Sequence, residues 1–249
     1  MKTGLIGAMR EEILLLKDDL KNLKVEKTGS REFYSGTIGG NELVMCLSGW
    51  GKVAAASTAT SLINLYGVDQ LIFIGLAGSM QPHLNIGDIV VADKLIQHDV
   101  DLSNLSGFGQ VKPPFWKKFE FEVGSETGQR ALKAVSRFAV NLKEKKYPGI
   151  NTDYAPSIYV GSIGTGDQFV ASPEGKSRIS SKFPDLLCTE MEGAAIAQVA
   201  ADYQLPCSVI RIISDQADEN AHQAFSRFLF ENISRISVEI ARLMFDQNE

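Results

Sequence analysis

Short apolar runs alternate with longer amphipathic segments along most of the chain. The apolar runs predict β-strands, and several are apolar at every position, as expected for strands covered on both faces. These runs are TGLIGAM (3–9), ELVMCLS (42–48), QLIFIGLA (70–77), DIVVADKLI (88–96), SIYVGSIG (157–164), LLCTE (186–190) and CSVIRIIS (207–214). The amphipathic segments predict helices over 10–21, 52–66, 127–142, 191–203 and 221–245.

This alternation favours one three-layer α/β domain, spanning residues 1–249, with a mainly parallel central sheet. REFYSGTIGG and NELVMCLS, which meet at Gly39, Gly40 and Asn41, instead predict a hairpin. Residues 101–118 are rich in Gly, Ser, Pro and aromatic side chains, and we expect a long loop that serves as a lid or contact surface. Residues 143–156 are polar and predict a solvated connection.

Composition narrows the possible partners. The 249 residues are 44% hydrophobic, which is enough for a sizeable core without disulfides or a structural metal. The formal net charge of -5 makes a nucleic acid a poor partner, because phosphate binding requires a basic face. Cys46, Cys188 and Cys207 each border an apolar run, so we expect reduced, buried thiols. We expect no signal peptide and no membrane helix, and therefore a cytoplasmic protein.

Acidic residues recur where the predicted strands end. They are Glu12, Asp167, Glu190, Glu192 and Asp215, and glycines stand beside several of them. Each acid alone has a structural explanation, such as a first-turn acid in a helix for Glu12 or a helix N-cap for Asp215 and Glu192. Ligands of open α/β sheets gather beyond the carboxyl ends of strands. Together these acids therefore predict a site that uses carboxylates for proton transfer and hydroxyl recognition.

Two other kinds of site have little support in the sequence. His98-Asp99-x-Asp101 could hold an ion, but no second histidine lies at ligand spacing, so a structural role is the better interpretation of His98. His83 and His222 are interpreted as loop residues. GLIGAM is not G-x-G-x-x-G, SGWGK is too short for a phosphate loop, and G-x-x-x-x-G-K-[ST] does not occur. We expect neither a metal nor a cofactor.

Several motifs, in this order and spacing, resemble one known family. They are IGAMREEI, SGWGKVAAA, GLAGSMQPHLNIGDIVV, QHDVD, GTGDQFVAS, TEMEGAAIAQVA and RIISDQAD, and the match runs from residue 1 to about 245. The chain resembles the 5'-methylthioadenosine/S-adenosylhomocysteine nucleosidases of the nucleoside phosphorylase superfamily. The resemblance implies a three-layer αβα sandwich whose central sheet is mixed and strongly curved. It also implies hydrolysis of the N-glycosidic bond between adenine and a 5'-thio-substituted ribose, with 5'-deoxyadenosine as a further candidate substrate.

The resemblance implies a role for each acid of the site. Asp215 matches the acid that protonates adenine at N7, with Ser214 holding its carboxylate. Glu12 matches the acid that binds and activates the attacking water. Glu192 matches the acid that binds the ribose hydroxyls, beside Met191, which packs against the sugar. One acid and one base on opposite sides of the bond is the arrangement of inverting glycoside hydrolysis, and it requires Asp215 to be protonated near neutral pH.

The resemblance also implies the residues that surround the substrate. Arg211 supports the carboxylate cluster, Phe169 stacks on adenine, and the backbone of Val170 binds the edge of the base. Met9, Trp50 and Phe225 line the sugar and 5'-thio pocket. The remaining substrate-binding candidates are Leu76, Ala77 and Gly78. The family is dimeric, and in it the neighbouring subunit lends lid residues to the site, for which Leu105, Phe108 and Pro113 are candidates. The helix over 52–66 is the expected interface.

The chain departs from the family at three positions. Trp50 replaces a smaller aliphatic residue, Leu76 replaces a small hydroxyl residue, and Gly193 stands where alanine or another small residue is usual. Three alternatives remain open. The chain could be a nucleosidase for a relative such as futalosine, a purine nucleoside phosphorylase, or a non-catalytic sensor of adenine nucleosides. Leu76 and Glu12 disfavour a phosphate site, and retention of Glu12, Glu192 and Asp215 disfavours a sensor.

Overall fold

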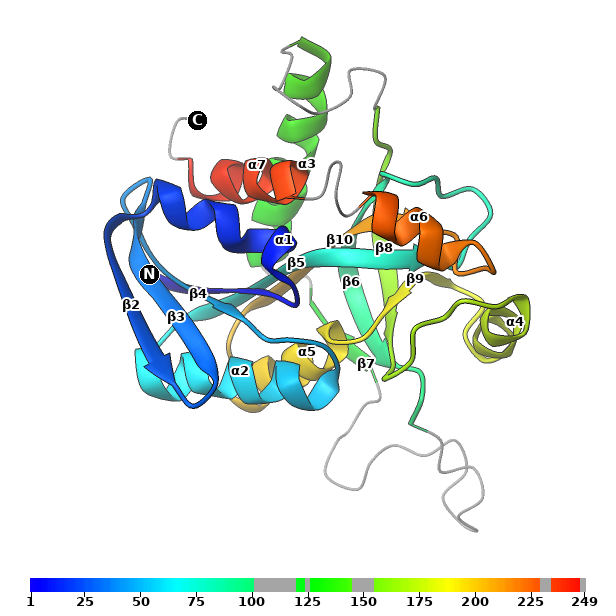
Figure 1. Ribbon diagram of the computed structural model, residues 1–249, viewed down its shortest axis with the longest axis horizontal. Coiled ribbons are helices and arrows are strands. Elements are labelled where there is room, and N and C mark those ends of the chain that lie inside the picture. The colour runs from blue at the N-terminus through cyan, green and yellow to red at the C-terminus, as the bar shows by residue number, and fades with distance from the viewer. Residues whose placement is uncertain (101–119, 124–125, 145–154, 229–233, 247–249) are drawn as a thin grey trace.

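The computed structural model describes residues 1–100, 120–123, 126–144, 155–228 and 234–246. Its centre is a mixed ten-stranded sheet, and helices cover both faces of this sheet (Figure 1). The strands are β1 (Lys2–Gly7), β2 (Lys21–Thr28), β3 (Arg31–Ile38), β4 (Asn41–Leu47), β5 (Gln70–Ser79), β6 (Ile89–Gln97), β7 (Glu120–Glu122), β8 (Ile158–Thr165), β9 (Leu186–Glu190) and β10 (Cys207–Asp215). The expected fold class, a three-layer αβα sandwich, is confirmed.

The helices follow the strands along the chain. They are α1 (Arg10–Ile13), the 3-10 helix η1 (Leu14–Asp19), α2 (Lys52–Tyr66), α3 (Glu126–Glu144), α4 (Pro173–Lys182), α5 (Gly193–Asp202), α6 (Ala221–Phe228) and α7 (Ser234–Phe245). Helices α2 and α5 pack together on one face of the sheet, while α1, α3 and α7 lie on the other (Figure 1). Among the described residues, no helix is long and apolar enough to span a membrane.

Part of the sheet closes on itself. β10 pairs with β5 in parallel and with β6 in antiparallel orientation. β6 continues through β8 to β9, and the end of β9 returns to the end of β5 at Gly78 and Ser79. On the other side of β5 the sheet stays open through β1, β4, β3 and β2. The closure of five strands explains the strong curvature expected for this sheet.

The central strands β5 and β10 are buried on both faces, as their apolar runs predict. Along β10, Val209 and Ile213 belong to the core beneath α2 and α5, whereas Ile210 and Ile212 belong to the core beneath α1, α3 and α7. Alternate side chains of a strand point to opposite faces, so one apolar run serves both cores. The three cysteines are buried and unpaired, and burial raises the pKa of each thiol.

Most predicted elements are confirmed, including the hairpin, in which Ile38 faces Asn41 across the turn. Residues 10–21 were expected to form one helix, and this is wrong, because α1 ends at Ile13 and gives way to η1, and Lys21 begins β2. The 221–245 segment contains two helices, α6 and α7. Helix α4 was not predicted, although Ser172 caps it by accepting a hydrogen bond from Gly175 N at 3.1 Å. The expected lid over 101–118 lies outside the described residues.

Candidate functional site

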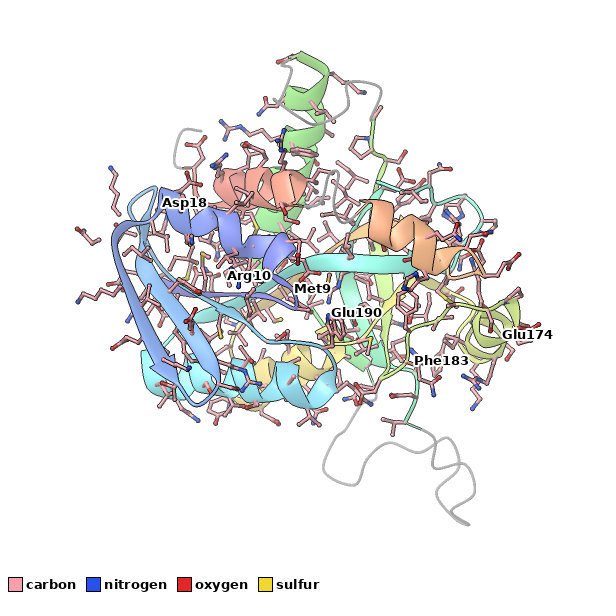
Figure 2. The ribbon with its side chains drawn as sticks, viewed as in Figure 1. Met9, Arg10, Asp18, Glu174, Phe183 and Glu190 are labelled. Atoms are coloured by element: carbon pink, nitrogen blue, oxygen red, sulfur yellow. The ribbon has the colours of Figure 1, made fainter. Side chains whose placement is uncertain are left out.

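A cavity of about 440 Å³ opens where β1, β5, β9 and β10 end, a size typical of sites for small molecules. It gathers most of the residues that the sequence marks as candidates. The lining consists of Ala8, Met9, Glu12, Trp50, Leu76, Ala77, Gly78, Gln168, Phe169, Val170, Thr189, Glu190, Met191, Glu192, Ser214, Asp215 and His222. Met9 and Glu190 lie in the middle of the molecule, between α1 and α5 (Figure 2).

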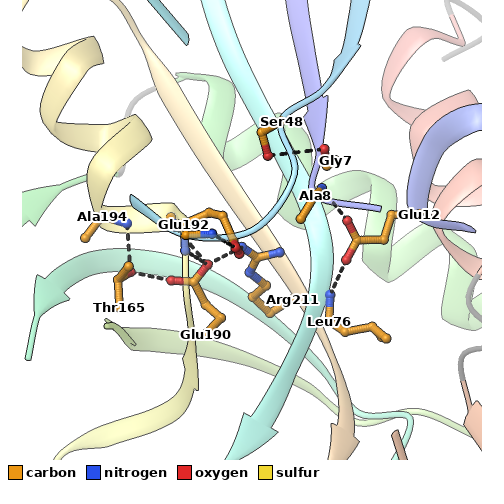
Figure 3. Close-up of polar contacts among 12 residues, drawn as sticks. Gly7, Ala8, Glu12, Ser48, Leu76, Thr165, Glu190, Glu192, Ala194 and Arg211 are labelled. Carbon is orange, nitrogen blue, oxygen red and sulfur yellow. Dashed lines mark hydrogen bonds and ion pairs between the residues drawn. The ribbon is translucent and has the colours of Figure 1, made fainter. Parts of the chain in front are cut away.

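Glu12 is held by backbone donors from two elements. It lies in the first turn of α1, where its Oε2 accepts hydrogen bonds from Ala8 N at 2.5 Å and Met9 N at 3.0 Å. Its Oε1 accepts a third, from Leu76 N of β5 at 3.2 Å (Figure 3). The carboxyl is buried, and this desolvation raises its pKa, although the charge of Arg211 and the three N–H groups oppose the rise. Glu12 is therefore both a first-turn acid and a cavity acid.

Arg211 is fully buried on β10 and faces a cluster of carboxylates (Figure 3). It forms an ion pair with Glu190, and its Nη2 lies 3.8 Å from Glu192 Oε2. The guanidinium carbon lies 3.8 Å from the centroid of the Phe73 ring, at cation–π distance. Arg211 thus supports the acids from beneath, as the resemblance implies, and it does not line the cavity.

Glu190 has a structural task besides its ion pair. Its Oε2 accepts hydrogen bonds from Glu192 N at 3.1 Å and Gly193 N at 2.7 Å, at the start of α5. Its Oε1 accepts a hydrogen bond from Thr165, whose oxygen in turn accepts one from Ala194 N. The two carboxylates that flank Met191 are therefore divided in function. Glu190 caps the helix and binds Arg211, which leaves Glu192 free to face the cavity.

Glu192 is buried at the N-cap of α5 but makes no capping hydrogen bond with its side chain. Its Oε1 instead accepts a hydrogen bond from Gly51 N at 2.7 Å. Burial, and then the negative charge of Glu190, raises the pKa of Glu192 to about 8, against the pull of Arg211. The alternative in which the Glu192 side chain caps its own helix does not hold, because Glu190 and Thr165 accept the hydrogen bonds of the N–H groups at the start of α5.

Asp215 closes β10 on the other side of the cavity. Its Oδ2 accepts a hydrogen bond from the Ser214 hydroxyl at 2.7 Å, and its Oδ1 accepts one from Ala217 N at 2.9 Å. Ser214 also lies 3.3 Å from the Ala77 carbonyl. Burial raises the pKa of Asp215, while these two hydrogen bonds and the charge of Lys176 work against the rise. A carboxyl of this kind retains a proton to higher pH than an exposed aspartate does.

The remaining predicted residues form the walls of the cavity. Met9, Trp50, Phe169, Val170 and Met191 all line it, and Trp50 is 72% exposed at the mouth. The strand end Leu76, Ala77 and Gly78 forms another wall. The lid candidates Leu105, Phe108 and Pro113 and the side chain of Phe225 lie outside the described residues.

Sequence reasoning missed three lining residues and misplaced another. Gln168, Thr189 and Ala8 neighbour predicted residues but were not singled out. His222 was expected in a loop, and this is wrong, because it lies in the first turn of α6 and lines the cavity. In the sequence, a histidine seven residues after the strand-end pair Ser214 and Asp215 is the signal that could have pointed to His222. Its reach into the cavity depends on how α6 packs on β10, which no local pattern encodes.

The histidine of the QHDVD motif has a structural environment. His98 Nε2 lies 3.2 Å from the Thr189 hydroxyl, and burial lowers the pKa of the imidazole. Within the ranges that the structure describes, no group of three His, Cys, Asp or Glu side chains is placed to hold a metal ion.

Comparisons with known proteins place the chain in a family. The model of the phosphorylase superfamily matches residues 2–245. A 5'-methylthioadenosine/S-adenosylhomocysteine nucleosidase of Bacillus subtilis is 34% identical over 229 residues, 92% of each chain. One from Maridesulfovibrio salexigens is 35% identical over 244 residues, 98% of each chain. The structure of the S. pneumoniae nucleosidase with a transition-state inhibitor superposes with a TM-score of 0.85, at 32% identity over 100% of both chains.

The identity exceeds 30% over nearly the whole length of these relatives, and the fold agrees with it. The chain belongs to the phosphorylase superfamily and, within it, to the family of the 5'-methylthioadenosine/S-adenosylhomocysteine nucleosidases.

Proposed function

We propose that the protein hydrolyses the N-glycosidic bond of 5'-methylthioadenosine and S-adenosylhomocysteine, releasing adenine and the 5'-thio-substituted ribose. The main observation in support is that two buried carboxyls with raised pKa values, Glu12 and Asp215, line one cavity but come from separate strand ends. Hydrolysis of a glycosidic bond needs one group that donates a proton to the leaving group and another that accepts a proton from water.

Asp215 is the proposed general acid. As the bond breaks, its carboxyl proton moves to N7 of adenine, and the base leaves as a neutral molecule. The Ser214 hydroxyl and Ala217 N each bind one carboxyl oxygen, which fixes the direction of the group. Burial raises the pKa of Asp215 and so favours the protonated carboxyl that this step requires.

Glu12 is the proposed general base. It accepts a proton from the water whose oxygen bonds to the anomeric carbon, and its three backbone donors hold it in place. Glu192 accepts hydrogen bonds from the ribose hydroxyls, with Met191 against the sugar. Phe169 stacks on adenine and the Val170 backbone binds its edge, while Met9 and Trp50 line the pocket for the 5' substituent. A positioned acid or base contributes about 10²–10⁴-fold to the rate.

Phosphorolysis is disfavoured by the charge of the cavity. Of the described lining residues, Glu12, Glu190, Glu192 and Asp215 are acidic, and none is lysine or arginine. A phosphate ion bound there would have no lysine or arginine side chain of this lining to pair with, and an ionised Glu12 would repel it. Leu76, at the position usual for a small hydroxyl residue, donates its backbone N–H to Glu12 rather than to an anion.

The test is adenine release from methylthioadenosine in phosphate-free buffer. We expect turnover by the wild type and a loss of about 10²–10⁴-fold in kcat for Glu12→Gln. The matched control is Glu11→Gln, which removes the neighbouring, less buried acid and leaves kcat unchanged. A requirement for phosphate would indicate a phosphorylase, and full activity of Glu12→Gln would exclude Glu12 as the base. S-adenosylhomocysteine, 5'-deoxyadenosine and futalosine, tested alongside, determine the preferred 5' group.

We also propose that the protein works as a cytoplasmic homodimer in methionine salvage and nucleoside catabolism. The three reduced thiols suit a reducing compartment. The apolar residues exposed on α2 suit a dimer interface. The products of the proposed reaction, adenine and a thio-substituted ribose, are starting materials for salvage.

A further inference from the structure

We propose that Lys52, Asp99 and Asp167 form a positioning clamp, which sets the distance between the loop that binds Glu192 and the loop that carries Phe169. This inference rests on the proposed function, because it concerns how the ribose and adenine portions of one substrate are held at the same time. The three side chains come from different parts of the chain, which makes the clamp a tertiary feature rather than a local turn.

The clamp is a closed set of three contacts. Lys52 Nζ lies 2.6 Å from Asp99 Oδ1. Asp99 Oδ2 accepts a hydrogen bond from Asp167 N at 3.0 Å. Asp167 Oδ1 accepts one from Lys52 N at 2.8 Å. Three segments are joined in this way: the N-terminus of α2, the residues that follow β6, and the turn after β8.

Each side of the clamp leads directly into the site. Gly51 N donates to Glu192 at 2.7 Å, and the next N–H along the chain, that of Lys52, donates to Asp167. Two consecutive backbone donors therefore connect the proposed ribose acid to the clamp. Phe169 and Val170 follow Asp167 by two and three residues and line the cavity. A shift of the clamp would move the sugar and base subsites relative to each other.

Gly51 allows this close approach. Its φ of 92° is a left-handed conformation that favours glycine, and a Cβ there would lie 3.0 Å from Asp167 Oδ1. Glycine therefore brings the backbone against the Asp167 carboxylate, and the loop has little freedom to shift without losing one of the two hydrogen bonds.

The ion pair of the clamp is partly shielded from water. The side chains of Lys52 and Asp99 are 18% and 24% exposed, so salt screens their attraction less than that of a surface pair. Burial raises the pKa of Asp99, but the hydrogen bonds from Lys52 and Asp167 N outweigh it and lower the pKa on balance. Asp99 is thus an anion at neutral pH. No clamp residue is among the described lining of the cavity, so the clamp acts through its loops.

The test separates positioning from simple stabilisation. We expect Asp99→Asn and Lys52→Met each to raise KM for methylthioadenosine about tenfold, with kcat within about threefold of wild type. The double variant raises KM no more than either single variant does, because both substitutions remove the same Lys52–Asp99 ion pair. Adenine alone occupies only one of the two subsites that the clamp positions, so its dissociation constant, measured by calorimetry, changes by less than about threefold. Lys52→Arg keeps the positive charge, so its KM stays close to the wild-type value.

The matched control is Lys94→Met. Lys94 lies on β6, the strand that precedes Asp99, and the substitution removes its ion pair with Glu120 of β7, at 3.3 Å. Its KM stays at the wild-type value. If the clamp variants bound adenine and the nucleoside with equally weakened affinity, the positioning role would be overturned. A lower Tm with an unchanged KM would overturn it as well. If the wild type bound methylthioadenosine without releasing adenine, the proposed function would fail, and the dissociation constant of the nucleoside would replace KM in the same test. Binding of neither ligand would reject both proposals.

Discussion

At the scale of single residues, the main feature is the imbalance of charge around Arg211. One buried guanidinium faces Glu190 and Glu192, and the charge of Glu12 also acts on it. Three ionised carboxylates beside one cation would leave a large uncompensated charge in a buried cavity, which is energetically costly. The raised pKa of Glu192 relieves this cost, because the group remains protonated in the empty site near neutral pH.

This protonation predicts how stability depends on pH. The pKa of Glu192 rises from 4.5 to about 8 on folding, so the folded protein binds a proton that the unfolded chain releases between these values. The contribution of Glu192 to stability is therefore present below pH 4.5 and lost as pH rises toward 8. We expect Glu192→Gln to match the wild-type Tm near pH 5 and to exceed it above pH 8. The difference is about 2–4 °C for each kcal/mol by which the free energy of unfolding of the wild type has fallen.

Thermal unfolding of the ligand-free protein at several pH values measures this difference. Glu174→Gln is the matched control, since Glu174 is an exposed acid on α4 whose removal leaves the pH dependence unchanged (Figure 2). A Tm difference for Glu192→Gln that is constant across the pH range would contradict a buried, protonated Glu192.

At the scale of elements, β5 has to pass between Glu12 and Arg211. Gly75 is the β5 residue at this point, and a Cβ there would overlap Arg211 Nη1 and lie 2.6 Å from Glu12 Oε1. Leu76, the next residue, donates its N–H to Glu12. The absence of a side chain at Gly75 thus allows the acid of α1 and the arginine of β10 to meet across the strand.

Gly75→Ala is therefore expected to disturb the site and the core together. Overpacking of this kind costs about 1–3 kcal/mol in the free energy of unfolding, and displacement of Glu12 should lower kcat more than it raises KM. Gly128→Ala in α3 is the control, because its Cβ would have a nearest neighbour at 3.6 Å, an ordinary contact. Chemical denaturation and steady-state kinetics of both variants test this. If Gly75→Ala had the wild-type free energy of unfolding and the wild-type kcat, there would be room for a Cβ between Glu12 and Arg211.

Elements with strong apolar patterns were predictable, and those without them were not. β5 and β10 are apolar on both faces, and their ends, marked by glycines and acids, line the cavity. β2 was missed because all eight of its residues are exposed, so it has no apolar face to detect. The apolar run Leu14, Leu15 and Leu16 led to the prediction of one long helix. Of these three residues only Leu16 is buried, and they belong to the 3-10 helix η1.

At the scale of the whole molecule, closure of the sheet brings the acids together. Glu12, Glu192 and Asp215 follow strands that are far apart in sequence, and the pairing of β10 with β5 and of β9 with β5 brings those strand ends to one cavity. No local pattern specifies such pairings. The family resemblance named most of the residues that line this cavity, whereas the roles of Glu190 as a helix cap and of His222 as a wall emerged from packing.

The proposed homodimer leads to the last prediction. Val53 and Leu65 on α2 are 83% and 58% exposed, and Trp50 lies just before this helix, at the mouth of the cavity. Contiguous exposed apolar patches mark protein–protein interfaces, and the proposed dimer would cover these side chains. We expect the wild type to sediment as two chains of 27.2 kDa each, and Val53→Asp to weaken this association, because a symmetric interface would bury two new charges.

Sedimentation velocity with parallel assays of turnover tests the dimer. Val140→Asp is the control, since Val140 is an equally helical, 53% exposed valine on α3, away from α2. The resemblance implies that each subunit lends residues to the other's site, so turnover by Val53→Asp should fall as the protein is diluted and recover at high concentration. A wild type that sediments as a monomer while turning over methylthioadenosine would contradict the dimer, and it would mean that each chain completes its own site.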